Sequence, residues 1–333
     1  MSLPFSIQFL PVENISALAA DKNVLAAIRF ASIASVEDTQ KPLFSVGLPN
    51  LALSNVVEVW YSDAPVQTAM ADGIQLAWND DILFGHILLD ETQYEGTASA
   101  TEEAYRLIIN TVRDFSYPSI LRIWNYLSSA NENKQALAHY QAFSQGRQKV
   151  LDDVVDLAYI PPASTVIRTS CAGLQLYFIA AKHSGVQLRN PRQANDFLYP
   201  RHYGPARPAF SRAIVKKWQD KVHLYISGMA SIRSYKKHYN AQVQLQVDET
   251  LNNIEALLAY GAKKLNLSIN KLTDLSYLKV YLSDLFMLSV TEELLIRRYG
   301  HQLPPVIFLR GDMCHDDLLL EIEAAYTCNE VDR

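Results

Sequence analysis

Five arginines gather in a short, proline-rich stretch of the sequence: Arg189, Arg192, Arg201, Arg207 and Arg212. Four prolines and four aromatic residues separate them, and the stretch contains a single acid. Proline restricts the backbone, so the composition predicts a stiff loop. Guanidinium groups bind carboxylates through two parallel hydrogen bonds, which suits a small dianion. A solvated basic loop, or arginines paired with acids elsewhere in the chain, is the alternative.

Two glutamates near the end of the chain are candidates for acid chemistry. Apolar and acidic residues alternate over 320–324, which predicts a strand with Glu321 and Glu323 on one face. Apolar neighbours and a second carboxylate both raise the pKa of a carboxyl group. Glu321 would then hold a proton for general-acid work at neutral pH. A short helix over 316–326 and two solvated glutamates at a sheet edge are the alternatives, and residue types alone favour the solvated pair.

Other chemistries find little support. The eight histidines show no metal-ligand spacing, so no metal is expected. We find no phosphate loop, dinucleotide fingerprint or nucleophile elbow. The three cysteines are odd in number and unpatterned, which argues against a disulfide framework and fits a reducing cytoplasm.

Composition narrows the class of protein further. The net charge of −5 argues against a nucleic-acid partner. No stretch approaches the roughly 18 apolar residues of a membrane helix, and the first ten residues do not resemble a signal peptide. We therefore expect a cytoplasmic protein without a membrane partner. A chain of 333 residues favours two cores over one.

Hydrophobic periodicity predicts an alternation of strands and helices in both halves of the chain. In the first half we expect strands at 24–33, 56–61, 82–89 and 121–126, and helices at 101–115 and 135–156. In the second half we expect strands at 174–181, 222–226, 278–282 and 306–310, and helices at 243–260 and 290–299. Pro161 and Pro162 interrupt this order, so we place a domain boundary between about 150 and 162. The halves look like two related α+β units.

The arginine-rich stretch resembles the chorismatase family. Residues 199–205 read Tyr-Pro-Arg-His-Tyr-Gly-Pro, followed by Pro208, Phe210 and Ser-Arg-Ala at 211–213. Further stretches resemble the family in the same order: residues 58–60, 83–85, 121–126, 140–147, 173–178, 227–231, 249–255, 311–314 and 318–323. The resemblance covers nearly the whole chain.

This resemblance implies an α+β fold of two RidA-like (YjgF/chorismate-mutase-like) domains, each a mixed β-sheet with helices packed on one face. We expect them at residues 1–155 and 156–333, with most of the active site in the second. The implied reaction cleaves the enolpyruvyl ether of chorismate, releasing pyruvate and forming 3-hydroxybenzoate. No cofactor is implied, and chorismate is the expected small-molecule partner. Two fused units favour a monomer.

The resemblance also assigns roles to residues. Glu321 matches the catalytic glutamate of the family. Cys314 matches the branch that makes 3-hydroxybenzoate, in which the ring hydroxyl of the substrate, rather than water, captures the cation. Its place before a turn of helix would favour a thiolate. Substrate binding is expected from four residues around these groups: Tyr199, Arg201, Arg212 and Arg310.

Some positions depart from the family pattern. The combination of Ala230 with Cys314 is similar to that of bifunctional members, which yield both 3- and 4-hydroxybenzoate. Ala230 is expected to contact the substrate. Ser283 replaces an arginine, and 234–235 replace a glycine-histidine pair. The alternatives are a hydrolase that forms a dihydroxycyclohexadiene carboxylate, and a chorismate-binding protein without catalysis. An imine deaminase is suggested by the fold alone and ranks last.

Overall fold

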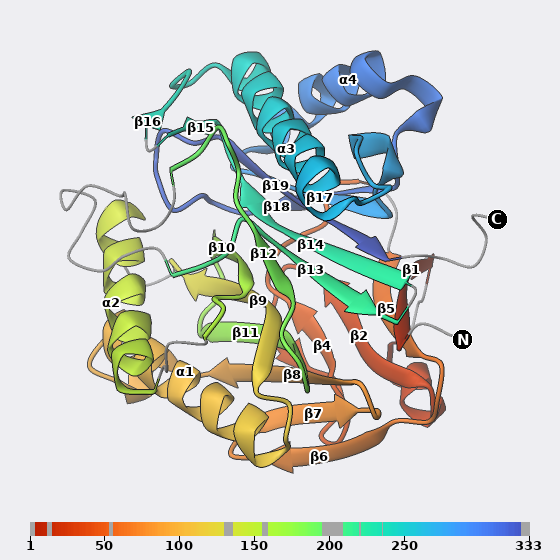
Figure 1. Ribbon diagram of the computed structural model, residues 1–333. Helices are drawn as coiled ribbons and strands as arrows, with labels where there is room; N and C mark the ends of the chain where they lie inside the picture. Colours follow the sequence, from red (N-terminus) through yellow and green to blue (C-terminus); the bar gives the residue numbers. More distant parts are fainter. Residues whose placement is uncertain are drawn as a thin grey trace.

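The computed structural model describes residues 4–11, 15–52, 56–129, 136–154, 159–194, 209–219, 221–234 and 236–327. Within these ranges, three large sheets lie in the middle of the molecule and four α-helices lie outside them (Figure 1). Helices α1 (Thr97–Asp114) and α2 (Ala136–Val154) cover one side of the sheets. Helices α3 (Val243–Leu265) and α4 (Leu288–Tyr299) cover the other.

The first sheet is built from the beginning of the chain and carries no α-helix of its own. Its strand order is β1 (Phe5–Pro11), β5 (Val56–Ser62), β2 (Val24–Phe30), β4 (Leu43–Val46) and β3 (Ser35–Val36). Strands β2, β4 and β5 are almost wholly buried. Other parts of the protein therefore cover these central strands of the first sheet.

The second sheet has six strands. Their order is β10 (Ala163–Thr169), β9 (Ser119–Ser128), β11 (Leu174–Ala181), β8 (Ile82–Leu89), β7 (Ile74–Trp78) and β6 (Gln67–Ala71). Helix α1 turns a stripe with Ala104, Ile108 and Val112 onto this sheet, which is the spacing of an amphipathic helix. Short 3₁₀ turns occur at Ile15–Ala20 and Glu91–Gln93.

The third sheet also has six strands. Their order is β12 (Val186–Leu188), β13 (Ala213–Trp218), β14 (Lys221–Met229), β19 (Leu320–Thr327), β17 (Tyr277–Leu282) and β18 (Val306–Arg310). A small hairpin of β15 (Ile232–Arg233) and β16 (Lys236–Lys237) follows β14. Short 3₁₀ turns occur at Leu272–Asp274, Leu285–Met287 and Gly300–Gln302.

The second and third sheets have the same plan. In each, all neighbouring strands are antiparallel except the last pair, β9–β10 or β17–β18, which is parallel. In each, the last strand of the unit, β11 or β19, inserts into the middle of the sheet. Residues 67–181 and 186–327 are therefore two structural repeats, as the two α+β halves predicted.

The predicted domain boundary needs correction. Strand β10 pairs with β9, and β11 pairs with both β8 and β9, so both strands belong to the first repeat. The division by sheet membership falls between Ala181 and Val186, not near residue 155. The two prolines lie inside the first repeat and do not mark its end. They directly precede β10, an edge strand, and proline is tolerated at that position.

Equivalent positions of the two repeats meet face to face. Trp124 pairs with Tyr177 in the second sheet, and Lys279 pairs with Glu323 in the third. Across the sheets, Trp124 Nε1 donates to Glu323 Oε1 at 2.7 Å, and Lys279 Nζ donates to Tyr177 Oη at 3.3 Å. The two contacts are reciprocal, so the inner faces of the repeats pack as a pair.

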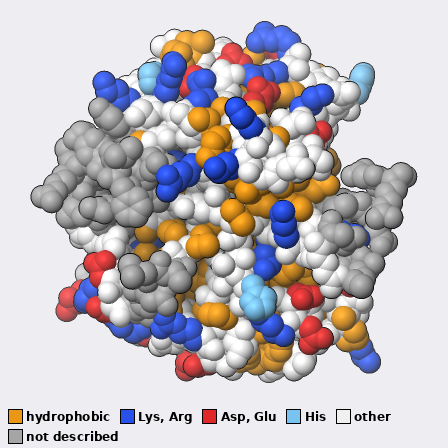
Figure 2. Space-filling model, in the orientation of Figure 1, with side chains coloured by type: hydrophobic (Ala, Val, Ile, Leu, Met, Phe, Trp, Pro, Cys, Tyr) orange, Lys and Arg blue, Asp and Glu red, His pale blue; other side chains and the backbone are white. Residues whose placement is uncertain are grey.

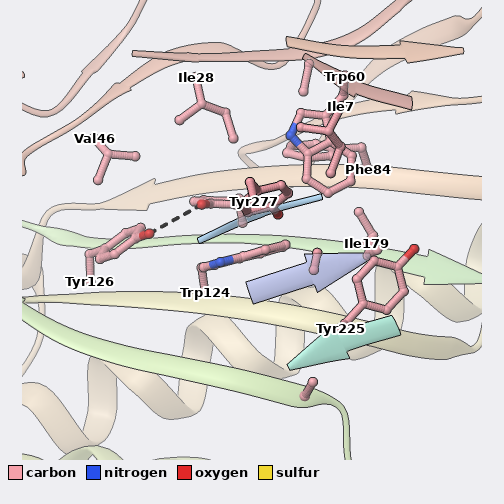
Figure 3. Packing of buried hydrophobic residues seen from close by; sticks show 14 of the residues in the cluster. Ile7, Ile28, Val46, Trp60, Phe84, Trp124, Tyr126, Ile179, Tyr225 and Tyr277 are labelled. Carbon is pink, nitrogen blue, oxygen red and sulfur yellow. Dashed lines mark hydrogen bonds between the residues drawn. The ribbon is translucent and has the colours of Figure 1, made fainter. Parts of the chain in front are cut away.

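Aromatic side chains fill the space between the three sheets (Figure 3). Trp60 of the first sheet packs edge-on against Phe84 at 5.3 Å and Trp124 at 6.0 Å, measured between ring centroids. The Tyr126 hydroxyl lies 3.3 Å from the hydroxyls of both Tyr177 and Tyr281. Large rings in offset and edge-to-face packing make this the main shared core.

The predicted elements appear in the structure, but several strands were not predicted. The sequence did not predict ten of the described strands, because short strands carry weak period-2 signals. They are β1, β3, β4, β6, β7, β10, β12, β13, β15 and β16. None of the helices in the described ranges is long and apolar enough to cross a bilayer.

On the face shown in Figure 2, several Lys and Arg side chains border an apolar area near the middle.

Candidate active site

Glu321 and Glu323 lie on β19, in the interior of the third sheet between β14 and β17. In the register with β17, Tyr281 pairs with Glu321 and Lys279 pairs with Glu323. Both carboxylates therefore share the inner face, which confirms the predicted strand and alternation. The alternative of two solvated glutamates at a sheet edge is wrong.

Glu323 is a buried, ionised carboxylate. It accepts hydrogen bonds from Arg122 Nη2 at 2.8 Å, Trp124 Nε1 at 2.7 Å and Thr165 Oγ1 at 2.6 Å. Lys279 Nζ lies 3.5 Å away. Burial by itself would raise the pKa of Glu323, but the two cations and the hydrogen bonds hold it below the ordinary value.

Glu321 has the opposite protonation preference. The side chain is half-buried, and its pKa is raised to about 8. Burial is the largest cause, and the negative charge of Glu323 is the second; the positive charges of Arg122 and Arg212 oppose the shift. This confirms the direction predicted from the apolar neighbours and the second carboxylate. At neutral pH the chain therefore presents a protonated carboxyl next to a fixed carboxylate.

A β-bulge in β14 makes room for the Glu321 carboxyl. Ile226 pairs with Ala324 and Met229 pairs with Ile322, so two residues of β14 face one of β19. Gly228 is one of the two, and a Cβ atom at this position would overlap Glu321 Oε1. Only glycine leaves the space that the carboxyl occupies.

Cys314 is a neutral thiol in this arrangement. Its Sγ lies 3.1 Å from the Val166 carbonyl oxygen of β10, to which it donates. Burial raises the pKa of the thiol well above its usual value, the charge of Glu321 adds to this, and Arg168 and Arg147 oppose it. The predicted thiolate is wrong because burial and the charge of Glu321 favour the neutral thiol. The expected helix is also missing, since a turn follows Cys314 before β19.

Three guanidinium groups from the first repeat carry buried N–H groups without a hydrogen-bond partner among the described residues. They are Nη1 of Arg122 on β9, Nε and Nη2 of Arg147 on α2, and Nε of Arg168 on β10. A buried donor without an acceptor is costly, so a ligand carboxylate here would satisfy groups that the described residues leave without an acceptor.

These three arginines were not among the site residues predicted from the sequence. Arg122 and Arg147 lie within stretches that carry the family resemblance, which is the signal that was available. Arg168 lies in none of these stretches, so the sequence offered no reason to predict it as a site residue. Its place follows from β10, which lies beside the turn that holds Cys314 and pairs with it through the backbone of Asp312.

Of the predicted binding residues, Arg212 and Ala230 lie near this group. Arg212 is buried, its guanidinium stacks on Phe210 at 4.9 Å, and its charge acts on Glu321. Ala230 is buried one residue beyond β14, and its carbonyl accepts from Asn253 Nδ2 at 3.0 Å. Their roles toward a substrate stay predictions. Tyr199 and Arg201 lie outside the described residues.

Arg310 lies elsewhere, contrary to the prediction. It pairs in register with Leu282, whose side chain packs into the core under α3 and α4. Tyr281 and Glu321 lie on the other face of the sheet. The Arg310 guanidinium is 38% exposed and forms an ion pair with Asp312 at 2.7 Å. The alternation of the strand turns it away from the carboxyl.

Comparison with known proteins identifies the family. The family model of chorismatase FkbO/Hyg5-like proteins, N-terminal domain, matches residues 58–180. A chorismatase of Streptomyces rapamycinicus is 32% identical over 80% of this chain and 80% of its own length. The chain belongs to the chorismatase family. A 3-hydroxybenzoate synthase of Streptomyces hygroscopicus is 28% identical over 91% of both chains.

The fold of this chorismatase agrees with a solved structure of the family. The solved chorismatase structure superposes with a TM-score of 0.84 at 27% identity, over 97% of this chain and 98% of that one. The predicted α+β class, with mixed sheets and helices on one face, is thereby confirmed.

The raised pKa of Glu321 predicts a pH-dependent stability. The unfolded chain loses this proton near its ordinary pKa of 4.5, whereas the folded chain holds it to about 8. Stability is therefore lost as the pH rises through this window. The full shift would cost about 5 kcal/mol, and partial solvent contact lowers the expected value to about 2 kcal/mol.

A Glu321→Gln chorismatase should escape this loss. Relative to the natural chain, it should gain about 2 kcal/mol in the free energy of unfolding between pH 4 and pH 9, measured by urea titration. Glu292→Gln, on the exposed side of α4, is the control and should follow the natural chain. Parallel pH profiles for all three proteins would contradict the assignment of a raised pKa to Glu321.

Proposed function

We propose that this chorismatase cleaves the enolpyruvyl ether of chorismate, releasing pyruvate and forming 3-hydroxybenzoate. The observation that carries the proposal is a protonated carboxyl, Glu321, near Arg122, whose buried Nη1 has no hydrogen-bond partner among the described residues. Relatives named chorismatase and 3-hydroxybenzoate synthase support the substrate and the product. Chorismate carries two carboxylates and an enol ether, which match these groups.

The reaction begins with proton transfer from Glu321. The π electrons of the enol methylene form the new C–H bond, and the neighbouring carbon becomes an oxocarbenium ion stabilised by the ether oxygen. Glu321 is left as a carboxylate beside this cation, so the new charges attract each other. General-acid catalysis by a positioned carboxyl contributes about 10²- to 10⁴-fold to the rate.

Two pairs of arginines anchor the substrate. Arg122 and Arg212 act on the Glu321 carboxyl, so the enolpyruvyl carboxylate lies with them. Arg147 and Arg168 act on the Cys314 thiol, so the ring carboxylate lies with them. Guanidinium forks fix both ends of the dianion, which holds the methylene at the acid.

The ring hydroxyl of the substrate then captures the cation, and its proton returns to the Glu321 carboxylate. The bond from this hydroxyl oxygen to the side-chain carbon then breaks and its electrons form a bond to the neighbouring ring carbon. The ether bond of that ring carbon breaks at the same time, and its electrons form the keto group of the departing pyruvate. The arene-oxide-like intermediate that remains opens to the phenol. Pyruvate and 3-hydroxybenzoate together contain the atoms of chorismate, so no water is consumed. A hydrolase that forms the dihydroxycyclohexadiene carboxylate would consume one water.

The acid role of Glu321 is tested by turnover. Purified protein and chorismate should yield pyruvate, and Glu321→Gln should lower kcat by about 10²- to 10⁴-fold with the fold retained. Pyruvate formed in D₂O should carry one deuterium in its methyl group. The kcat of the natural chain should fall as the pH rises above about 8, because the acid is then ionised.

Glu292→Gln is the matched control and should keep full activity. Retained turnover in Glu321→Gln would place the acid elsewhere. No pyruvate from the natural chain would end the proposal; if chorismate then raised the Tm, the binding protein without catalysis would be favoured. Ser283, which lies after β17 where the family has an arginine, motivates that alternative.

The product mixture tests the part played by Cys314. Its buried thiol fills space beside Val166, where a water would otherwise be able to compete with the ring hydroxyl. Cys314→Ala should raise the fraction of the dihydroxycyclohexadiene acid, resolved by chromatography. Cys314→Ser, which keeps a donor to the carbonyl, is the control. An unchanged mixture in Cys314→Ala would contradict this role.

The natural chain combines Ala230 with Cys314, as bifunctional members of the family do. We therefore expect it to yield 4-hydroxybenzoate as a second product.

We further propose a monomer, because the two repeats face each other within one chain and bury their inner faces. Light scattering should give a mass near 37.5 kDa. A stable dimer or trimer mass would contradict this. The expected cytoplasmic location stays a prediction.

A further inference from the structure

The hydroxyl of Thr165 joins three groups at the junction of the two repeats. Thr165 lies on β10, is buried, and donates to Glu323 Oε2 at 2.6 Å. It accepts hydrogen bonds from Arg122 Nη2 and from the backbone N–H of Gly228, the latter at 3.2 Å. A hydroxyl has one donor and two acceptor sites, so all its capacity is used.

Strand β10 holds the bulge of β14 at both of its residues. The N–H of Ser164 donates to Ser227 Oγ at 2.8 Å, and Ser227 Oγ donates to the Ser211 carbonyl at 2.5 Å. The N–H of Gly228 donates to Thr165, as described. The strand of the first repeat thus fixes the backbone on which the Glu321 carboxyl of the second repeat rests.

We infer that Thr165 is a positioning residue of the active site, whose hydroxyl holds the Gly228 bulge and the Glu323 carboxylate in the arrangement that seats Glu321. This inference rests on the proposed function. Thr165 acts through its neighbours and touches neither the reacting carbon nor the acid itself.

Valine has nearly the shape of threonine but offers no hydrogen bond. In Thr165→Val, the Gly228 N–H would lose its acceptor directly beneath the Glu321 carboxyl and could donate to its ionised form. Arg122 would be released from Thr165, and Glu323 would lose a donor that favours its charge. All three changes favour the ionised form of Glu321 over the protonated acid.

The charged and titratable groups that act on Glu321 come from several elements. They are Glu323 on β19, Arg122 on β9, Arg212 before β13, Cys314 in the turn before β19 and, in register on β17, Tyr281. Thr165 bonds directly to two of these groups, Glu323 and Arg122. A change in the proton affinity of Glu321 therefore indicates that the Thr165 hydroxyl acts on Glu321 through these two groups.

The experiment compares pyruvate release by the natural chain, Thr165→Val and Thr165→Ser across pH. Thr165→Val should lower kcat by about 10- to 100-fold, as expected for hydrogen bonds to charged groups, with KM within about threefold. The alkaline limb of its kcat profile should move toward lower pH by about half a unit or more. Thr165→Ser keeps the hydroxyl and should keep the profile of the natural chain.

Circular dichroism and Tm establish that each variant is folded, and Thr165→Ala replaces Thr165→Val if the valine does not fold. Folded variants without the hydroxyl that keep the natural kcat would overturn the inference, and so would a lower kcat with an unmoved alkaline limb. In either case the active natural chain leaves the proposed function intact. An inactive natural chain would refute the proposed function, and the inference with it.

Discussion

A buried cluster of opposite charges at the meeting point of the three sheets is the constraint on which the site depends. Lys279 lies 2.5 Å from Glu58 of the first sheet and 3.5 Å from Glu323, while Arg122 of the second sheet binds Glu323 at 2.8 Å. Two acids face two bases where water is excluded; burial raises the pKa of Glu58, and the charge of Lys279 opposes this shift. Removing one partner of such a buried pair typically costs about 3–5 kcal/mol, which strongly disfavours other arrangements of the sheets.

The same cluster explains how a glutamate keeps its proton at neutral pH. Arg122 and Lys279 hold Glu323 ionised, and this fixed negative charge lies two residues from Glu321 on the same face. Burial and this charge together favour the neutral form of Glu321. Two neighbouring carboxyl groups with opposite protonation preferences are the arrangement that general-acid chemistry requires.

The pair of glutamates lies in one repeat of the duplicated fold. By strand register, the position of Glu321 on β19 corresponds to Gln175 on β11, opposite Tyr126 as Glu321 is opposite Tyr281. Gln175 bonds to the Ser45 carbonyl at 3.0 Å and to His86 at 3.0 Å. An amide network formed with the first sheet thus occupies the place in the first repeat that is equivalent to Glu321. An arginine of the first repeat lies instead near the carboxyl group of Glu321 in the second repeat.

The sequence by itself determined the four α-helices and about half of the strands that the structure describes, the shared face of Glu321 and Glu323, and the family, because these depend on local periodicity and on long motifs. Tertiary structure decided the rest. Arg122 lies 201 residues from Glu323, so no local pattern could predict their contact. Protonation also depends on burial and on charges from distant strands, which favour a neutral thiol at Cys314 and a neutral carboxyl at Glu321. The register of β18 with β17 turns Arg310 away from that carboxyl.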